Sequence, residues 1–157
     1  MMNSPIARFS KVAVVALLGV GLTLGGCKSS KSTSYMDAYN SGNHAEAYKR
    51  ASEASTSGPQ AEREQASLVA GLSAHSLGND SDAKRYLQPI SYSSNPEIAG
   101  KANATLGLIA EAQGDNAGAA RAFEQAGSKL TGDEAARAYL HAGDAYAAAG
   151  NKTLADS

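Results

Sequence analysis

Residues 106–126, with the sequence LGLIAEAQGDNAGAARAFEQA, decide the fold of this chain. The stretch begins with an apolar run of helix-forming residues, which a Gly-Asp pair at 114–115 interrupts. Glycine often ends a helix because it adopts the left-handed conformation, and aspartate caps the start of the next helix. After the break, Ala119, Phe123 and Ala126 recur at helical spacing on one face. The stretch therefore predicts two antiparallel helices joined by a short turn.

The same pair of residues recurs every 36 positions. It occurs at 42–43, 78–79, 114–115 and 150–151, and the residue after the glycine is asparagine or aspartate each time. A period between about 20 and 50 residues is typical of stacked helical repeats, in which each unit buries its apolar face against its neighbours. The spacing therefore predicts an array of helix pairs.

Small residues follow the same period. Alanine lies five residues after each of these glycines, at Ala47, Ala83, Ala119 and Ala155, and another glycine lies seven residues before three of them, at Gly71, Gly107 and Gly143. A glycine inside a helix costs roughly 1 kcal/mol relative to alanine, so its recurrence needs a packing reason. We predict that these small residues, together with Phe123, are the positions at which paired helices touch.

This pattern resembles the tetratricopeptide repeat, a helix pair with a sparse signature of large and small residues. The third unit matches the signature at Leu106, Gly107, Ala119, Phe123 and Ala126, and the fourth matches it at Tyr139, Gly143, Tyr146 and Ala155. The first unit departs from it, because Ser34 and Tyr35 stand where a Leu-Gly pair is expected. The resemblance implies an all-α fold, a right-handed α-solenoid of about 3.5 helix pairs, with units at about 35–58, 59–94, 95–130 and 131–157.

Eight helices are expected within these units, at 35–41, 44–56, 60–77, 80–93, 97–113, 116–129, 133–149 and 151–157. Asn95 precedes Pro96 and is expected to cap the fifth helix. Pro89 falls late in the fourth helix, where its missing N–H should kink or shorten that helix.

Residues 1–26 have the features of a signal peptide. Arg8 and Lys11 give a positive start, and residues 12–24 are uncharged and too few to span a membrane as a helix. The segment leads into Leu24-Gly25-Gly26-Cys27, which resembles a bacterial lipobox. The resemblance implies cleavage before Cys27 and acylation of that cysteine. The alternative is an ordinary secretory signal that places the sole cysteine here by chance.

The lipobox resemblance also implies a location. Fatty acyl chains on Cys27 would hold the protein at a bacterial membrane, since each buried methylene adds about 0.8 kcal/mol. Lys28 follows the cysteine, which by the sorting tendency of such lipoproteins implies the outer membrane, facing the periplasm. The inner membrane and the cell surface are the alternatives. Residues 27–34 are expected to form the acylated cysteine and a flexible polar tether.

The composition argues against several classes of function. Beyond residue 26 the chain has 12 Lys and Arg against 15 Asp and Glu, a net charge of −3 without a basic stripe, so a nucleic-acid partner is not expected. The three histidines, His44, His75 and His141, occupy unrelated positions within their units. The sequence also lacks the motifs of nucleophile elbows, P-loops and zinc proteases. We predict that the protein is not an enzyme and binds neither a metal nor a cofactor.

The resemblance to tetratricopeptide repeats directs attention to the concave groove lined by the first helix of each unit. It implies groove positions at Tyr39, Leu72, His75, Lys101, Glu111, Arg137 and Asp144. Lys101 and Arg137 are equivalent positions of adjacent units and could together hold the carboxylates of a peptide. A solvated charged face is the alternative interpretation.

We therefore expect a membrane-anchored scaffold of the bacterial cell envelope, which binds a peptide or a partner helix of an envelope protein in this groove. Two alternatives remain. The first is a structural lipoprotein that forms a homo-oligomer through its uncapped C-terminal repeat. The second is a non-catalytic accessory to an envelope hydrolase.

Overall fold

A computed structural model describes residues 31–150, and this part of the chain is all-α. It contains seven helices and no strand: α1 (Lys31–Asn40), α2 (His44–Ala54), α3 (Gln60–Ser76), α4 (Asp80–Ile90), α5 (Pro96–Ala112), α6 (Asn116–Lys129) and α7 (Gly132–Ala148). The predicted all-α class is confirmed for these residues. The expected signal peptide at 1–26, the acylated Cys27 and the expected helix at 151–157, with Ala155, lie outside the described residues.

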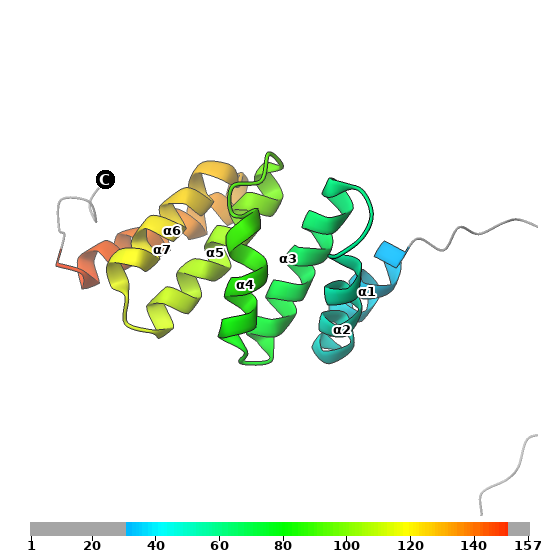
Figure 1. Ribbon diagram of the computed structural model, residues 1–157. Helices are drawn as coiled ribbons and strands as arrows, with labels where there is room; N and C mark the ends of the chain where they lie inside the picture. The colour runs from blue at the N-terminus through cyan, green and yellow to red at the C-terminus, as the bar shows by residue number, and fades with distance from the viewer. Residues whose placement is uncertain (1–30, 151–157) are drawn as a thin grey trace, which may run out of the picture.

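The helices follow one another from one end of the molecule to the other, with α1 and α7 at opposite ends (Figure 1). Each helix packs against the next one in the chain. In addition, α1 contacts α3, and α3 contacts α5. The last described helix differs, because α7 packs on α6 but makes no comparable backbone contact with α5. The spacing between odd-numbered helices is therefore wider at this end.

Three of the turns between helices have the same hydrogen bonds. Gly42, Gly78 and Gly114 have φ angles of 77°, 76° and 77°, in the left-handed region that favours glycine. At the first turn, the Gly42 N–H donates to the Tyr39 carbonyl at 2.9 Å and the Asn43 N–H donates to the Ala38 carbonyl at 2.8 Å. The other two turns repeat both bonds. This pair of bonds satisfies carbonyl groups at the helix end and stops the helix at the glycine.

The residue after each glycine also starts the next helix. The side chains of Asn43, Asn79 and Asp115 accept hydrogen bonds from the backbone N–H three residues later, at 3.2, 3.2 and 2.8 Å. Each of these bonds satisfies an N–H that has no partner within its own helix. A single Asx residue thus belongs to both helices, which keeps the connection short and the two helices antiparallel.

Two helix ends differ from the expected ones by three residues or more. The first helix begins at Lys31, four residues before the expected start, so residues 31–34 belong to α1 and not to a flexible tether. The Arg50 side chain of α2 donates to the Ser34 hydroxyl and so links this first turn to the next helix. The fourth helix ends at Ile90, one residue after Pro89, and is three residues shorter than the expected 80–93.

The paired helices approach each other closely where a glycine faces a large side chain. A Cβ atom added to Gly71 would lie 2.5 Å from Leu87 Cγ, and one added to Gly107 would lie 2.8 Å from Phe123 Cδ1. Atoms that are not bonded do not come so close, so larger residues would push the helices apart. Gly143, the equivalent position in α7, is partly buried, and its expected partner helix lies outside the described residues.

In the first helix pair, the large residue lies on the first helix and the small residue on the second, the reverse of the next two pairs. Tyr35 occupies the position equivalent to Gly71, and Ala51 occupies the position equivalent to Leu87. Both are buried, with 1% and 0% of their surface exposed. Large and small residues have therefore been exchanged across the pair while the combined volume is roughly kept. This exchange explains why the first unit departs from the sequence pattern and still forms a helix pair.

The buried side chains form three clusters in succession along the molecule. One lies between α1, α2 and α3, the next between α3, α4 and α5, and the third between α6 and α7. Ala47, Ala83 and Ala119, at equivalent positions of the even-numbered helices, are each fully buried. The small alanine allows the neighbouring helices to come close at the same point in each pair.

Candidate functional site

A pocket of about 260 Å³ opens between α5 and α7, whose backbones make fewer close contacts than those of α3 and α5. Its apolar walls come from α3, α5, α6, α7 and the turn before α7, and they consist of Leu72, Ala104, Leu108, Phe123, Leu130 and Ala138. The remaining lining residues are Lys101, Thr105, Glu134, Arg137 and His141. Apolar walls with a few polar groups are typical of ligand sites, although this volume suits one or two side chains rather than a large cofactor.

Of the two cations that line the pocket, Lys101 has a carboxylate partner within residues 31–150 and Arg137 has none. Lys101 Nζ lies 2.6 Å from a Glu97 carboxylate oxygen, one turn earlier in α5. The bond to Glu97 raises the pKa of Lys101, and the nearby carboxylate of Glu134 adds to this effect. The same bond lowers the pKa of Glu97. Arg137 forms no ion pair with any residue that the structure describes. Among residues 31–150, Arg137 is therefore the cation of the pocket that lacks a carboxylate partner at ion-pair distance.

An aromatic pair forms one side of the pocket. The His141 ring of α7 stacks on the Phe123 ring of α6, with ring centroids 4.9 Å apart and an angle of 24° between the planes. Phe123 itself is 2% exposed, because it also faces Gly107 of α5. The packing of Gly107 against Phe123 therefore fixes the position of the pocket wall.

Three of the seven expected groove residues line this pocket, namely Leu72, Lys101 and Arg137. Lys101 and Arg137, the expected pair of cations, do lie at the same site. However, Lys101 is already bonded to Glu97, so the two cations are not equally available to a ligand carboxylate.

The other four expected groove residues lie elsewhere. Tyr39 and His75 contact the first residue of the next helix: the Tyr39 ring meets the His44 ring at 5.5 Å, and His75 Nδ1 lies 2.8 Å from an Asp80 oxygen. Glu111 is the equivalent residue of α5, and it is exposed near the next turn. Asp144 is exposed and does not line the pocket. These four residues therefore do not line the pocket that contains Lys101, and their assignment to a groove stays a prediction.

Several lining residues escaped the sequence analysis. Ala104, Leu130 and Glu134 line the pocket but belong to no recognised motif. Ala104 and Glu134 differ in kind from the residues 36 positions earlier, Leu68 and Ile98, so a comparison at this spacing could have indicated them.

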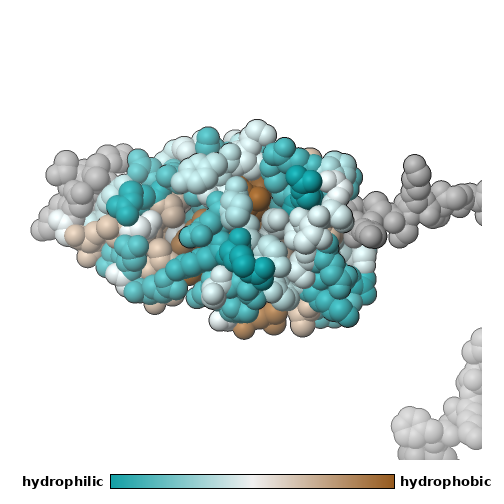
Figure 2. Space-filling view, viewed as in Figure 1, coloured by the Kyte–Doolittle hydropathy of each residue, from teal (hydrophilic) through white to brown (hydrophobic). Residues whose placement is uncertain are grey.

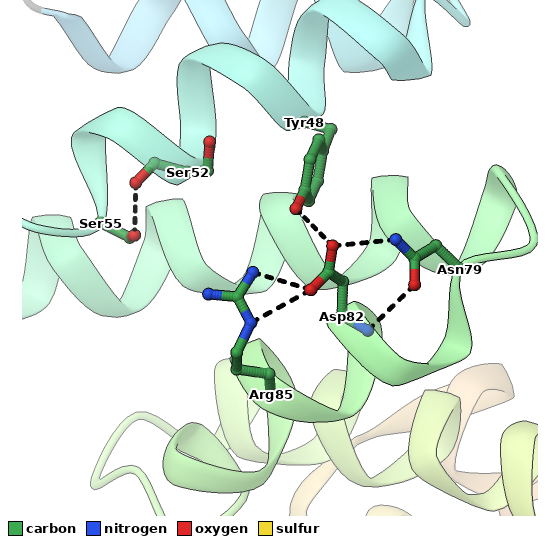
Figure 3. A network of polar contacts seen from close by, with 6 residues as sticks. All are labelled: Tyr48, Ser52, Ser55, Asn79, Asp82 and Arg85. Carbon is green, nitrogen blue, oxygen red and sulfur yellow. Dashed lines mark hydrogen bonds and ion pairs between the residues drawn. The ribbon is translucent and has the colours of Figure 1, made fainter.

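A second group of polar contacts lies away from the pocket and joins two helix pairs (Figure 3). The Tyr48 hydroxyl of α2 donates to Asp82 of α4 at 2.7 Å, and the Asn79 side chain donates to the same carboxylate oxygen at 2.8 Å. The Arg85 side chain donates to the other oxygen through two nitrogens. The bond to Asp82 raises the pKa of Tyr48 to about 12. All three side chains donate to the Asp82 carboxylate, so we interpret the network as structural.

The rest of the described surface gives fewer indications. On the face seen in Figure 2, teal and white areas predominate, and brown atoms gather only in small areas. Within residues 31–150, no three His, Cys, Asp or Glu side chains are grouped as a metal site would require. None of the seven described helices is long and apolar enough to cross a membrane.

Comparison of the chain with protein-family models, with curated proteins and with solved structures finds no match.

Proposed function

We propose that this chain is a tetratricopeptide-like, right-handed α-solenoid that serves as a membrane-anchored interaction scaffold of the bacterial cell envelope. The repeated glycine turn supports the solenoid, because the same backbone angle and the same capping bond recur every 36 residues. The contacts of α1 with α3 and of α3 with α5 are those expected when successive helix pairs stack on one another.

The proposed location rests on the sequence of residues 1–28. Cleavage before Cys27 and acylation of its thiol and amino group would anchor the protein in the outer membrane, with the helices in the periplasm. No enzymatic activity is proposed, and the role requires neither a metal nor a cofactor.

The α5–α7 pocket is the observation that supports binding of a protein partner most directly. Its walls combine apolar side chains from four helices with the charges of Lys101 and Arg137. Such a site can bind a peptide or helix through an apolar anchor, while the charged groups favour one orientation. The partner is proposed to be another protein of the envelope.

The proposal can be tested by crosslinking the intact, membrane-anchored protein in its own cells and capturing it by affinity. Recovery of one envelope protein or assembly is expected. The yield should fall in a Lys101→Ala, Arg137→Ala double variant and remain unchanged in a control double variant of two exposed cations elsewhere, Lys49→Ala with Arg121→Ala. Equal capture by both double variants would show that the pocket is not the binding site.

One observation favours a second candidate function, which is self-association. On α7, Leu140 is 67% exposed and Tyr139 is 50% exposed, and both are large hydrophobic residues. A second copy of the chain could cover them. In that case, sedimentation velocity would show a size that increases with protein concentration, and Leu140→Asp would abolish the increase.

A further inference from the structure

Two successive contacts between odd-numbered helices use equivalent residues of very different size. In the first contact, Leu68 of α3 and Ile98 of α5 belong to one buried cluster, with 4% and 3% of their surface exposed. In the second, the equivalent residues, 36 positions later, are Ala104 of α5 and Glu134 of α7. A large aliphatic pair is thus replaced by a small residue and a charged one.

This replacement accounts for the pocket. Both Ala104 and Glu134 line it, together with Leu72 and Leu108. Protein interiors are normally packed without spaces of this size, and Leu68 and Ile98 fill the equivalent region one repeat earlier. The missing volume is that of aliphatic side chains. Leu108 remains 40% exposed at this site, so it offers apolar surface to an incoming group.

The charges of the pocket indicate which kind of residue should lie beside the bound apolar side chain. Lys101 is bonded to Glu97 and is close to Glu134, so its positive charge is already compensated. Arg137 has no carboxylate partner among residues 31–150. Because a guanidinium group pairs best with a carboxylate, an occupant with an acidic group beside its apolar side chain fits the site.

We propose that the α5–α7 pocket binds a leucine-sized side chain of an acidic peptide segment, with a glutamate or aspartate of that segment on Arg137. The bound side chain takes the place that Leu68 and Ile98 fill one repeat earlier. This inference rests on the proposed function as an interaction scaffold and adds the chemistry of the partner.

The first test uses the full chain in detergent and fluorescence anisotropy of three labelled, 13-residue, alanine-based peptides. The first peptide has a central leucine flanked by glutamates. In the second, lysines replace the glutamates, and in the third, alanine replaces the leucine. The first peptide should bind at least about ten-fold more tightly than either of the others, since burial of a leucine side chain contributes more than one ten-fold step in affinity. Failure of the first peptide to bind, or equal binding of all three, would overturn the proposal.

The second test fills the pocket from within. Ala104→Leu supplies the side chain that Leu68 supplies one repeat earlier and should reduce binding of the first peptide at least about ten-fold. The matched control is Ala112→Leu, at an exposed position of the same helix, which should leave binding unchanged. Circular dichroism should show the same helix content in both variants. Unchanged binding by a folded Ala104→Leu variant would overturn the proposal.

A third variant tests the charge independently of packing. Arg137→Glu should reverse the preference, so that the lysine peptide binds more tightly than the glutamate peptide. An unaltered preference for glutamate would contradict the role of Arg137. The crosslinking experiment in cells distinguishes failure of the pocket proposal from failure of the scaffold proposal. If crosslinking in cells captures an envelope protein equally well with Ala104→Leu, the scaffold function stands and only the pocket is wrong.

Discussion

The contact between Gly107 and Phe123 predicts that Gly107→Ala lowers the free energy of unfolding when Phe123 is present and raises it when Phe123 is replaced by alanine. Gly107→Ala normally stabilises a helix by about 1 kcal/mol, because alanine has the higher helix propensity. Here the new Cβ would lie 2.8 Å from two carbon atoms of the Phe123 ring. The ring cannot turn away freely, because it is 2% exposed and stacks on His141.

Overpacking of this kind costs about 1–3 kcal/mol, so we expect Gly107→Ala to lower the free energy of unfolding by about 1–2 kcal/mol. Phe123→Ala alone should lower it by about 3–5 kcal/mol, since a large buried ring is lost. Once the ring is absent, the same Gly107→Ala change has room and should raise the free energy of unfolding by about 1 kcal/mol. The two substitutions are therefore coupled by about 2–3 kcal/mol.

The assay is urea unfolding of the full chain, followed by far-ultraviolet circular dichroism, for the four members of this double-mutant cycle. Phe123→Leu offers a milder background that retains more stability. Ala136→Gly, at an exposed position inside α7, is the control for helix propensity and should cost about 1 kcal/mol. A Gly107→Ala variant that is more stable than the parent chain would refute the close approach of α5 and α6.

Three further outcomes are expected from single changes. Gly78→Ala should lower the free energy of unfolding by about 1–2 kcal/mol, because Gly78 has a φ angle of 76°. Gly78→Asn should lower it less, since asparagine tolerates the left-handed conformation better. Equal losses for the two variants in a urea titration would contradict this. Ser73→Ala should raise the free energy of unfolding by about 1–2 kcal/mol in the same assay, since the buried Ser73 hydroxyl has no hydrogen-bond partner among residues 31–150. A loss of stability would imply a bound water. The pKa of Tyr48 is raised from its ordinary value of 10.0 to about 12 in the folded state, so its contribution to stability is complete below about pH 10 and is lost as the pH rises toward about 12. Tyr48→Phe should remove this alkaline decrease, which a thermal melt at each pH would measure.

The turns were predictable from the sequence because their requirements are local. A left-handed residue at the end of a helix favours glycine, and a cap at the next helix favours asparagine or aspartate, so Gly42 and Asn43 can be recognised without knowledge of any distant contact. Their repetition at 36-residue intervals then fixes the approximate ends of most helices.

The packing of the first helix pair was not predictable in this way. When each position is compared separately with its equivalent, Tyr35 differs from the glycine at position 71 and Ala51 differs from the leucine at position 87. The structure depends on the sum of the two volumes, because the side chains share one buried space.

The pocket was not predictable for the same reason, because its size depends on side chains of two helices taken together. Lys101 and Arg137 were recognised as equivalent residues, but the space between α5 and α7 arises from the small size of Ala104 and from the charge of Glu134. Tyr39 and His75 were assigned to a groove by their place on the first helix of a unit. Their contacts with His44 and Asp80 lie beside the turns and outside this pocket, so the groove assignment of these two residues stays a prediction.

The most direct test of the account is photo-crosslinking in living cells from the wall of the pocket. A photo-crosslinking amino acid in place of Leu108 is compared with the same amino acid in place of the exposed Ala112. We predict that position 108 crosslinks to one envelope protein and that position 112 does not. The crosslink from position 108 should also disappear when Ala104→Leu is added. Crosslinks only between copies of this chain, or the same products from both positions, would contradict a scaffold that holds its partner in the α5–α7 pocket.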